Sequence, residues 1–162
     1  MKENRALEKM PAREAAVLYL RLSSADGPAA ESDSIQNQRA FLQEWAQGHG
    51  FRVVREFVDD GHTGTDFERP GFQELNRCLM DGSVHCILVK DLSRLGRNYA
   101  EMGRYLEQIF PRLGIRFIAV NDQYDSARNT DSVQQMAVFK NVFNDLYAAD
   151  ASAKVRTSLG IL

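Results

Sequence analysis

The stretch Ala15–Ser23 (AAVLYLRLS) decides the fold of this protein. Its first six residues are apolar without a break, which is typical of a short strand buried on both faces of a parallel sheet. Arg21 and Ser23 follow two residues apart. Because alternate residues of an extended chain point to the same side, we expect the Arg21 guanidinium and the Ser23 hydroxyl to face one site. The plainer alternative is a surface arginine beside a loop serine that caps a turn.

On the C-terminal side of this stretch, helical patterns alternate with further strand patterns. The first helix is expected behind Ser32, Asp33 or Ser34 as its N-cap, the second from Pro70 and the third from Tyr99. Strands that alternate with helices predict an α/β fold: a mainly parallel sheet with helices on both faces, in three layers. The further strands are expected at Phe51–Val58, Val84–Val89 and Ile115–Val120.

The two ends of the chain differ from this pattern. Residues 1–14 are charged and are expected to form a flexible arm, so that one globular domain spans residues 15–130. Residues 131–162 read as a long C-terminal helix whose apolar side chains cover more than one face, which predicts that another chain covers it. The alternative is a helix that is buried more deeply in its own domain. These apolar side chains are Val133, Met136, Val138, Phe139, Val142, Phe143, Leu146 and Tyr147.

The composition excludes several classes of protein. Charged residues make up 26% and hydrophobic residues 44%, which is typical of a globular chain and not of a disordered or fibrous one. No apolar run reaches the roughly 18 residues of a membrane span, and residues 1–14 do not resemble a secretory signal. The two cysteines form no disulfide framework. We therefore expect a cytoplasmic protein with no membrane partner.

The net charge of the chain indicates no binding partner, but the excess of arginine over lysine favours a phosphate ligand. The formal net charge is −2, which does not favour nucleic acid. The chain holds 15 Arg and only 5 Lys. The planar arginine fork suits paired phosphate oxygens, although biased codon usage explains the same excess.

Three polar segments follow three of the expected strands: Arg21–Ser23, Asp59–Arg69 and Lys90–Arg97. The carboxyl ends of parallel strands meet at one edge of a sheet, where ligands gather. Four arginines at that edge would bind an anion, and phosphate is the natural candidate. Arg94 and Arg97, three residues apart, share a face near a helix N-terminus if this segment is helical; otherwise they form a solvated basic turn.

Taken together and in order, these motifs resemble the serine site-specific recombinases, and most closely the large branch of phage-type integrases and mobile-element transposases. The resemblance runs from about Ala15 to the C-terminus. It is carried by Tyr19-x-Arg21-x-Ser23, Ser34-Ile35-Gln36-Asn37-Gln38, Asp59-Asp60-Gly61-His62-Thr63-Gly64-Thr65, Glu68-Arg69-Pro70-Gly71-Phe72 and Lys90–Asn98.

The resemblance implies a resolvase-like catalytic domain and a role for each matching residue. Ser23 matches the nucleophile that attacks a DNA phosphodiester and becomes linked to the 5′ phosphate. Gln38 matches an active-site glutamine, and Asp60 and Thr63 match polar positions beside the site. Ser93 departs from the smaller resolvases and invertases, which usually carry Asp there. The arginines that would surround the scissile phosphate are Arg21, Arg69, Arg94 and Arg97.

The chemistry of such a site needs cations but no cofactor. A phosphodiester under attack gathers negative charge, which preorganised guanidiniums stabilise. The three histidines are scattered and no acidic triplet has metal-site spacing, so we expect neither metal nor cofactor. A serine nucleophile also needs a general base. Asp59, Asp60 and water all remain candidates.

Two functions follow as hypotheses. The first is an enzyme that cuts double-stranded DNA through Ser23, exchanges the ends and reseals them. The resemblance implies a homodimer or tetramer built on the C-terminal helix, acting at the nucleoid of a bacterium or in a phage-encoded system. The family's DNA-reading domains have no counterpart here, so we expect a part of a longer protein. The alternative is a non-catalytic α/β module that binds a phosphorylated ligand and regulates a partner.

Overall fold

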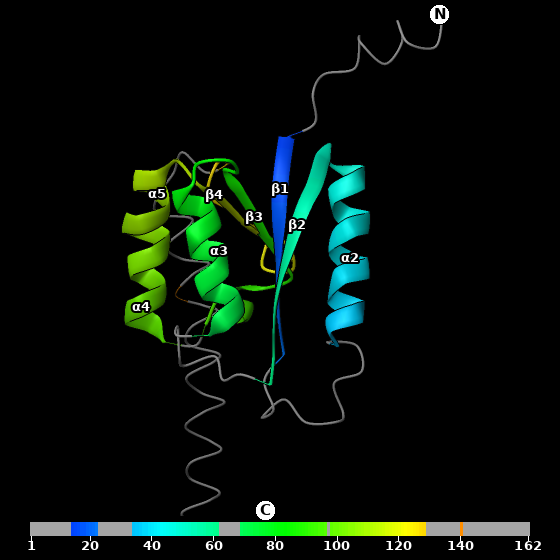
Figure 1. Cartoon of the computed structure of the whole chain (residues 1–162), viewed down its shortest axis with the longest axis horizontal. Coiled ribbons are helices and arrows are strands. Elements are labelled where there is room, and N and C mark those ends of the chain that lie inside the picture. The colour runs from blue at the N-terminus through cyan, green and yellow to red at the C-terminus, as the bar shows by residue number, and fades with distance from the viewer. Residues whose placement is uncertain (1–13, 23–33, 62–68, 97, 129–139, 141–162) are drawn as a thin grey trace, which may run out of the picture.

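A five-stranded sheet in the order β2-β1-β3-β4-β5 forms the centre of the molecule (Figure 1). The computed structural model describes residues 14–22, 34–61, 69–96, 98–128 and 140. The first four strands in this order are parallel and β5 is antiparallel to β4. The strands are β1 (Glu14–Leu22), β2 (Phe51–Asp60), β3 (Cys86–Val89), β4 (Arg116–Ala119) and β5 (Tyr124–Asp125).

Helices cover both faces of the sheet, which confirms the expected three layers. On one face, here called the α2 face, Leu42 and Ala46 of α2 (Ile35–Gly48) pack against Leu18 and its neighbours. The opposite face, the α3 face, is covered by α3 (Pro70–Met80), α4 (Tyr99–Arg104) and α5 (Phe110–Leu113). Figure 1 shows α2 alone on one side of the strands and the other three helices together on the other side.

The helix ends follow local rules that the sequence carries. Ser34 is the N-cap of α2, and its hydroxyl accepts a hydrogen bond from the Asn37 N–H at 3.1 Å. Pro70 is the first residue of α3, where a missing N–H costs nothing. Gly114 ends α5 in the left-handed conformation at φ 68°.

The helical segment before Gly114 is less regular than its apolar spacing predicts. Residues Tyr105–Ile109 form a π-type turn between α4 and α5, in which the Phe110 N–H bonds to the Tyr105 carbonyl five residues back. Pro111 follows directly and cannot donate to the preceding turn. The helix continues only to Leu113, so Pro111 lies in its last turn.

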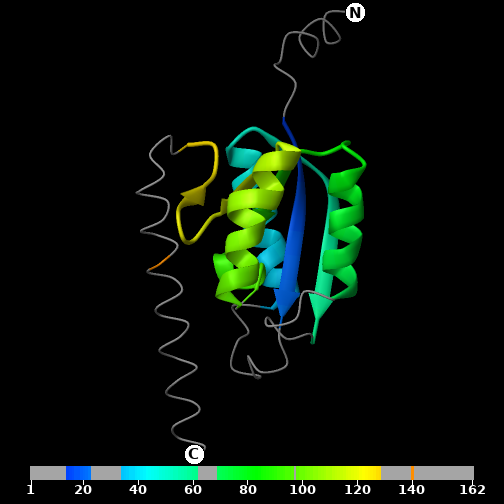
Figure 2. The same cartoon turned by 90° about the vertical axis from the view of Figure 1, so that its left-hand side faces the viewer.

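All four expected strands differ from the observed ones by one or two residues at one end or both. β1 begins at Glu14, inside the arm expected at 1–14. β3 and β4 are shorter than the expected strands, and β2 runs on through Asp60. The segment after the last expected strand contains β5, which consists of two residues and lies at the edge of the sheet (yellow in Figure 2). A two-residue strand inside a polar segment has no periodicity by which to recognise it.

A β-bulge divides β2 into two halves that face opposite ways. Ala16 pairs with Val53 but Val17 pairs with Arg55, so Val54 is an extra residue. Before the bulge, Phe51 packs on the α2 face; after it, Phe57 packs on the α3 face. The shifted register then aligns the ends of the two strands, and Arg21 lies opposite Asp59.

The outer parts of the chain lie beyond the described residues. These include most of the expected arm at 1–14 and, apart from residue 140, the helix expected over 131–162. Lys140 is helical and exposed. Within the part that the structure describes, no helix is both long and apolar enough to span a membrane.

Candidate active site

Arg21 lies at the carboxyl end of β1 and is fully buried. Its Nη2 donates to the Ser93 carbonyl at 2.6 Å and its Nε to the Arg94 carbonyl at 3.2 Å. Both acceptors belong to the 3₁₀ turn Leu92–Arg94, which follows β3. Because β3 is the neighbour of β1 in the sheet, this turn comes within reach of the Arg21 fork.

Arg94 in turn donates a hydrogen bond to the end of β1. It is 5% exposed, and its Nη1 donates to the Arg21 carbonyl at 3.0 Å. Its Nε lies 3.5 Å from Asp91 Oδ2, so the Asp91 carboxylate offsets part of its charge. The two arginines thus bind each other's backbone, which fixes the end of β1 against the turn after β3.

Arg69 reaches the same turn from a third element. It occupies the N-cap position of α3 and is 1% exposed. Its Nη2 donates to the Leu95 carbonyl at 2.5 Å. Carbonyl groups of three consecutive residues therefore accept hydrogen bonds from Arg21 or Arg69. A carbonyl acceptor is neutral and leaves the positive charge of the guanidinium in place.

Gln38 positions the end of β1 from the opposite face of the sheet. It lies on α2 and is fully buried. Its Nε2 donates to the Arg21 carbonyl at 3.1 Å, and its Oε1 accepts from the Arg21 N–H at 3.4 Å. The amide thus pairs with both backbone groups of Arg21. This side chain thus contacts the backbone of a candidate site residue and holds the end of its strand.

The two aspartates at the end of β2 have different surroundings, which bears on the choice of general base. Asp59, expected in the polar segment that follows the second strand, is in fact a buried residue of that strand and accepts three hydrogen bonds. They come from the Tyr19 hydroxyl at 2.7 Å, the Gly71 N–H at 2.8 Å and the Phe72 N–H at 2.9 Å. These donors occupy its carboxylate, so Asp59 is a poor candidate for the general base.

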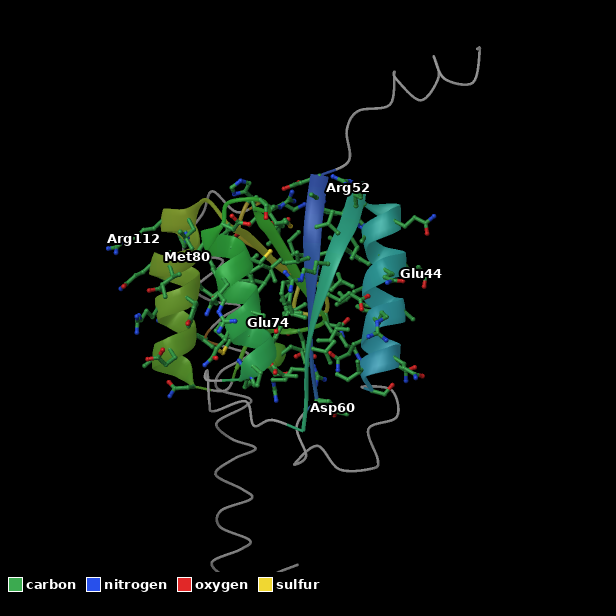
Figure 3. The ribbon with its side chains drawn as sticks, viewed as in Figure 1. Glu44, Arg52, Asp60, Glu74, Met80 and Arg112 are labelled. Atoms are coloured by element: carbon green, nitrogen blue, oxygen red, sulfur yellow. The ribbon has the colours of Figure 1, made fainter. Side chains whose placement is uncertain are left out.

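Asp60, by contrast, is exposed at the end of β2 (Figure 3). It lies opposite Leu22 in the ladder, and the following Gly61 N–H donates to the Leu22 carbonyl at 2.7 Å. Leu22 is the residue directly before Ser23 in the sequence. The end of β2 therefore lies beside the point where the chain continues to Ser23.

Gly71 is required because α3 begins so close to β2. A Cβ at this position would lie 2.7 Å from the Val58 carbonyl oxygen and 2.9 Å from Asp59 Oδ2. Only a residue without a side chain lets the first turn of α3 approach Asp59 and donate two N–H groups to it. The Arg69-Pro70-Gly71 sequence thus places Arg69 at the edge of the sheet.

The segment after β3 does not have the helical geometry that the sequence allowed. Arg94 lies in the 3₁₀ turn, and α4 begins only at Tyr99, behind Asn98 as N-cap. Arg94 therefore precedes the N-terminus of α4, which begins at Tyr99 as expected, and because Arg94 is buried it does not belong to a solvated basic turn. The short turn instead presents its carbonyl groups to the neighbouring arginines.

Ser93 contributes its backbone to this cluster more than its hydroxyl. Its carbonyl accepts from Arg21, while its hydroxyl donates a short hydrogen bond to the Asp91 carboxylate. A carboxylate is therefore present beside Ser93 although the residue itself is not an aspartate. Three further candidates, Ser23, Thr63 and Arg97, lie outside the described residues.

Sequence reasoning missed two residues that hold the cluster together. Tyr19 appeared only as part of a motif, and its hydroxyl binds Asp59. Asp122, in the segment after β4, accepts the Leu92 N–H at 2.6 Å and so holds the first residue of the 3₁₀ turn. Burial raises the pKa of Asp122, the Leu92 N–H opposes this, and the nearby Asp91 charge raises it further. An aspartate in a polar loop carries no pattern that reveals such a contact.

The arrangement suits the binding of an anion that gains charge during a reaction. Three buried guanidiniums converge at the carboxyl edge of β1 and β3, and each is fixed by backbone carbonyls. Preorganised cations of this kind stabilise the transition state of phosphoryl transfer without reorganising.

Comparison with known proteins assigns this chain to a family. The family described as "Resolvase, N terminal domain" matches residues 16–159. The catalytic domain of TP901-1 integrase has a TM-score of 0.68 at 24% identity, covering 84% of this chain and 98% of that one. At this identity the likeness shows the fold.

Two further structures are similar. A resolvase family site-specific recombinase from Streptococcus pneumoniae has a TM-score of 0.60 at 25% identity, covering 91% and 95% of the two chains. The catalytic domain of ISC1926 TnpA, an IS607-like serine recombinase, has a TM-score of 0.55 at 26% identity, covering 76% and 75%. A search of curated proteins gives no match.

The family match spans nearly all of the described fold, and two of the similar structures cover 84% and 91% of this chain. The protein is therefore a DNA recombinase, and DNA is the partner on which it acts. The chain belongs to the resolvase N-terminal domain family, as the catalytic domain of a serine site-specific recombinase.

Proposed function

We propose that this domain cuts DNA by a direct attack of the Ser23 hydroxyl on a phosphodiester, forming a 5′-phosphoserine link. The observation that carries the proposal is the convergence of Arg21, Arg69 and Arg94 at the end of the strand that leads into Ser23. Arg97, Thr63 and Ser93 are proposed to complete the phosphate site.

The proposed step balances without a cofactor. The Ser23 oxygen forms a bond to phosphorus and gives its proton to a base, while the bond between phosphorus and the 3′ oxygen breaks. The released 3′ oxygen takes up a proton. Rejoining is the reverse, with a 3′ hydroxyl attacking the phosphoserine, so the phosphoester energy is kept and ATP is not needed.

Asp60 is the protein group proposed as the base, and water is the alternative. Its support is its exposure and its place opposite Leu22, while Asp59 is occupied by three donors. Gln38 is proposed to act by holding the backbone of Arg21.

The experiment uses a plasmid that carries the DNA flanking the protein's own coding region. The protein is incubated with this plasmid, denatured, and analysed on a gel for protein-linked DNA ends. We expect a covalent product on the 5′ ends, its loss in Ser23→Ala, and its retention in the matched control Ser24→Ala.

Two results would overturn the proposal. A covalent product that survives Ser23→Ala but not Ser24→Ala would assign the nucleophile to the neighbouring serine. Tight DNA binding without any covalent product would favour the non-catalytic phosphate-binding module instead.

We further propose that the protein acts as a homodimer that pairs into a tetramer through residues 131–162, at the nucleoid in the cytoplasm. The support is the sequence, in which apolar residues cover more than one face of the expected helix. Strand exchange joins two DNA sites and therefore needs more than one catalytic subunit.

A further inference from the structure

The carboxylate of Asp59 connects the two aromatic residues that border Arg69. Its Oδ2 accepts both the Tyr19 hydroxyl at 2.7 Å and the Phe72 N–H at 2.9 Å. The Arg69 guanidinium carbon lies 5.6 Å from the centre of the Tyr19 ring and 5.2 Å from that of Phe72. Thus the residues that Asp59 holds are the same residues that face the arginine.

The Tyr19 and Phe72 rings together form a slot in which the Arg69 guanidinium lies. The Tyr19 and Phe72 rings meet edge to face, with centres 5.7 Å apart and planes 71° from parallel. Both residues are fully buried, and Asp59 is 2% exposed. A guanidinium over aromatic faces is attracted by the ring electrons, and this attraction is stronger where water is excluded. The slot therefore sets the direction in which Arg69 enters the arginine cluster.

The contacts of the Tyr19 hydroxyl suggest a role other than phosphate binding. It donates to Asp59, and burial is the main cause that raises the pKa of Tyr19 above its ordinary value, although Arg69 acts in the opposite sense. The phenol thus stays protonated at any working pH. Its hydrogen bond fixes the tilt of the ring on which Arg69 lies.

We propose that Asp59 and the Tyr19 hydroxyl are positioning residues for Arg69 in the recombination reaction. They hold the guanidinium so that it serves the phosphate at the end of β1. This proposal rests on the function proposed above, in which Arg69 stabilises the phosphodiester under attack.

The test removes the hydroxyl and leaves the ring. Tyr19→Phe is compared with Tyr105→Phe, because the Tyr105 ring also packs edge to face on Phe72, with centres 5.1 Å apart. The Tyr105 hydroxyl accepts from Asn76 Nδ2 at 3.5 Å and is not attached to Asp59. We expect Tyr19→Phe to slow covalent product formation about tenfold, the scale of one lost hydrogen bond to a charged group. We expect Tyr105→Phe to leave the rate unchanged.

The same Tyr19→Phe change, made in an Arg69→Lys variant, separates a positioning role from a merely structural one. In Arg69→Lys, the slot no longer holds a guanidinium, so Tyr19→Phe should slow the reaction less than about twofold further. A merely structural effect would slow both backgrounds by the same factor. Equal factors in the two backgrounds would therefore overturn the proposal.

If the Arg69→Lys variant forms no detectable covalent product, a measurement without DNA tests the positioning role. The Arg69 Nε–H is followed by NMR, and its hydrogen exchange should be about tenfold faster in Tyr19→Phe than in Tyr105→Phe. Equal exchange in the two variants would overturn the positioning role. Unchanged cleavage in Arg69→Ala would instead overturn the function proposed for Arg69, whatever the exchange rates show.

Discussion

At the residue scale, the site is made of side chains that bind backbone. Arg21, Arg69 and Arg94 donate to carbonyl groups of neighbouring elements, and Gln38 pairs with the backbone of Arg21. Backbone acceptors are fixed by the fold and cannot rotate away. The guanidiniums are consequently held in place before any substrate arrives, which is the condition for effective charge stabilisation.

Arg94→Ala should lower the rate of DNA cleavage by about 10²–10³, the scale for loss of one charge-stabilising donor. The change also removes the hydrogen bond to the Arg21 carbonyl, although Gln38 still donates to that oxygen. The matched control is Arg104→Ala, an exposed arginine of α4 that pairs with Glu101 at 3.8 Å. Single-turnover cleavage compares the two variants, and a near-normal rate in Arg94→Ala would show that this guanidinium does not act on the phosphate.

Gly71→Ala should destabilise the domain by about 1–3 kcal/mol, because a Cβ would overlap the Val58 carbonyl and the Asp59 carboxylate. Gly103→Ala is the matched control. Gly103 lies in α4, where a Cβ would meet nothing within 4 Å, so alanine should stabilise the helix by about 0.5–1 kcal/mol. Urea unfolding of both variants measures the difference. Equal stability of the two would mean that α3 shifts away from β2 at no cost.

At the element scale, the bulge in β2 decides which side chains enter the site. Strict alternation would put Phe51, Phe57 and Asp59 on one face of the sheet, because all three have odd numbers. The extra residue Val54 sends Phe51 to the α2 face and the other two to the α3 face. Asp59 can therefore meet Tyr19 and the start of α3 while the first half of β2 still packs on α2.

Deletion of Val54 should prevent stable folding. Without the bulge, one half of β2 must turn its buried side chains to the wrong face, which exposes Phe51 or buries the charge of Asp59 away from its donors. Val54 is itself 42% exposed, so Val54→Thr should change stability by less than about 0.5 kcal/mol. Thermal unfolding of the two variants tests this, and a cooperative transition near the wild-type temperature in the deletion would contradict it.

At the scale of the whole molecule, the edge proposed as catalytic and the expected oligomer belong to different parts of the chain. The edge is built from residues up to Asp122, and the apolar helix is expected over residues 131–162. If subunits pair through that helix, a change there should alter assembly and leave the arginine cluster intact. Cleavage chemistry and assembly can then be separated by mutation.

Phe143→Glu should weaken self-association by at least about tenfold, the effect of losing one buried aromatic anchor. It should also abolish strand exchange, because recombination needs paired subunits. Lys140→Glu is the matched control, since Lys140 is exposed. Sedimentation velocity over a range of concentrations measures the assembly. A wild-type chain that stays monomeric at high micromolar concentration would count against the dimer.

The sequence by itself determined the order of the helices and of the four parallel strands, and the edge at which the candidate site lies. Unbroken apolar runs such as Ala15–Leu20 reveal buried strands, and Pro70 and Ser34 mark helix starts, because these effects act within a few residues of the chain. Arg21, Arg69 and Arg94 could be assigned to one edge, since parallel strands bring their carboxyl ends together. The family resemblance rested on the same short motifs.

Only the tertiary structure decided how that edge is built. The bulge at Val54, the two-residue strand β5 and the three donors around Asp59 depend on contacts between distant segments, such as Asp59 with Tyr19 forty residues earlier. The short turn at Leu92–Arg94 is likewise held by Asp122, 30 residues away. Local propensity carries no record of such partners, because a buried polar group takes its hydrogen bonds from whatever the packing brings beside it.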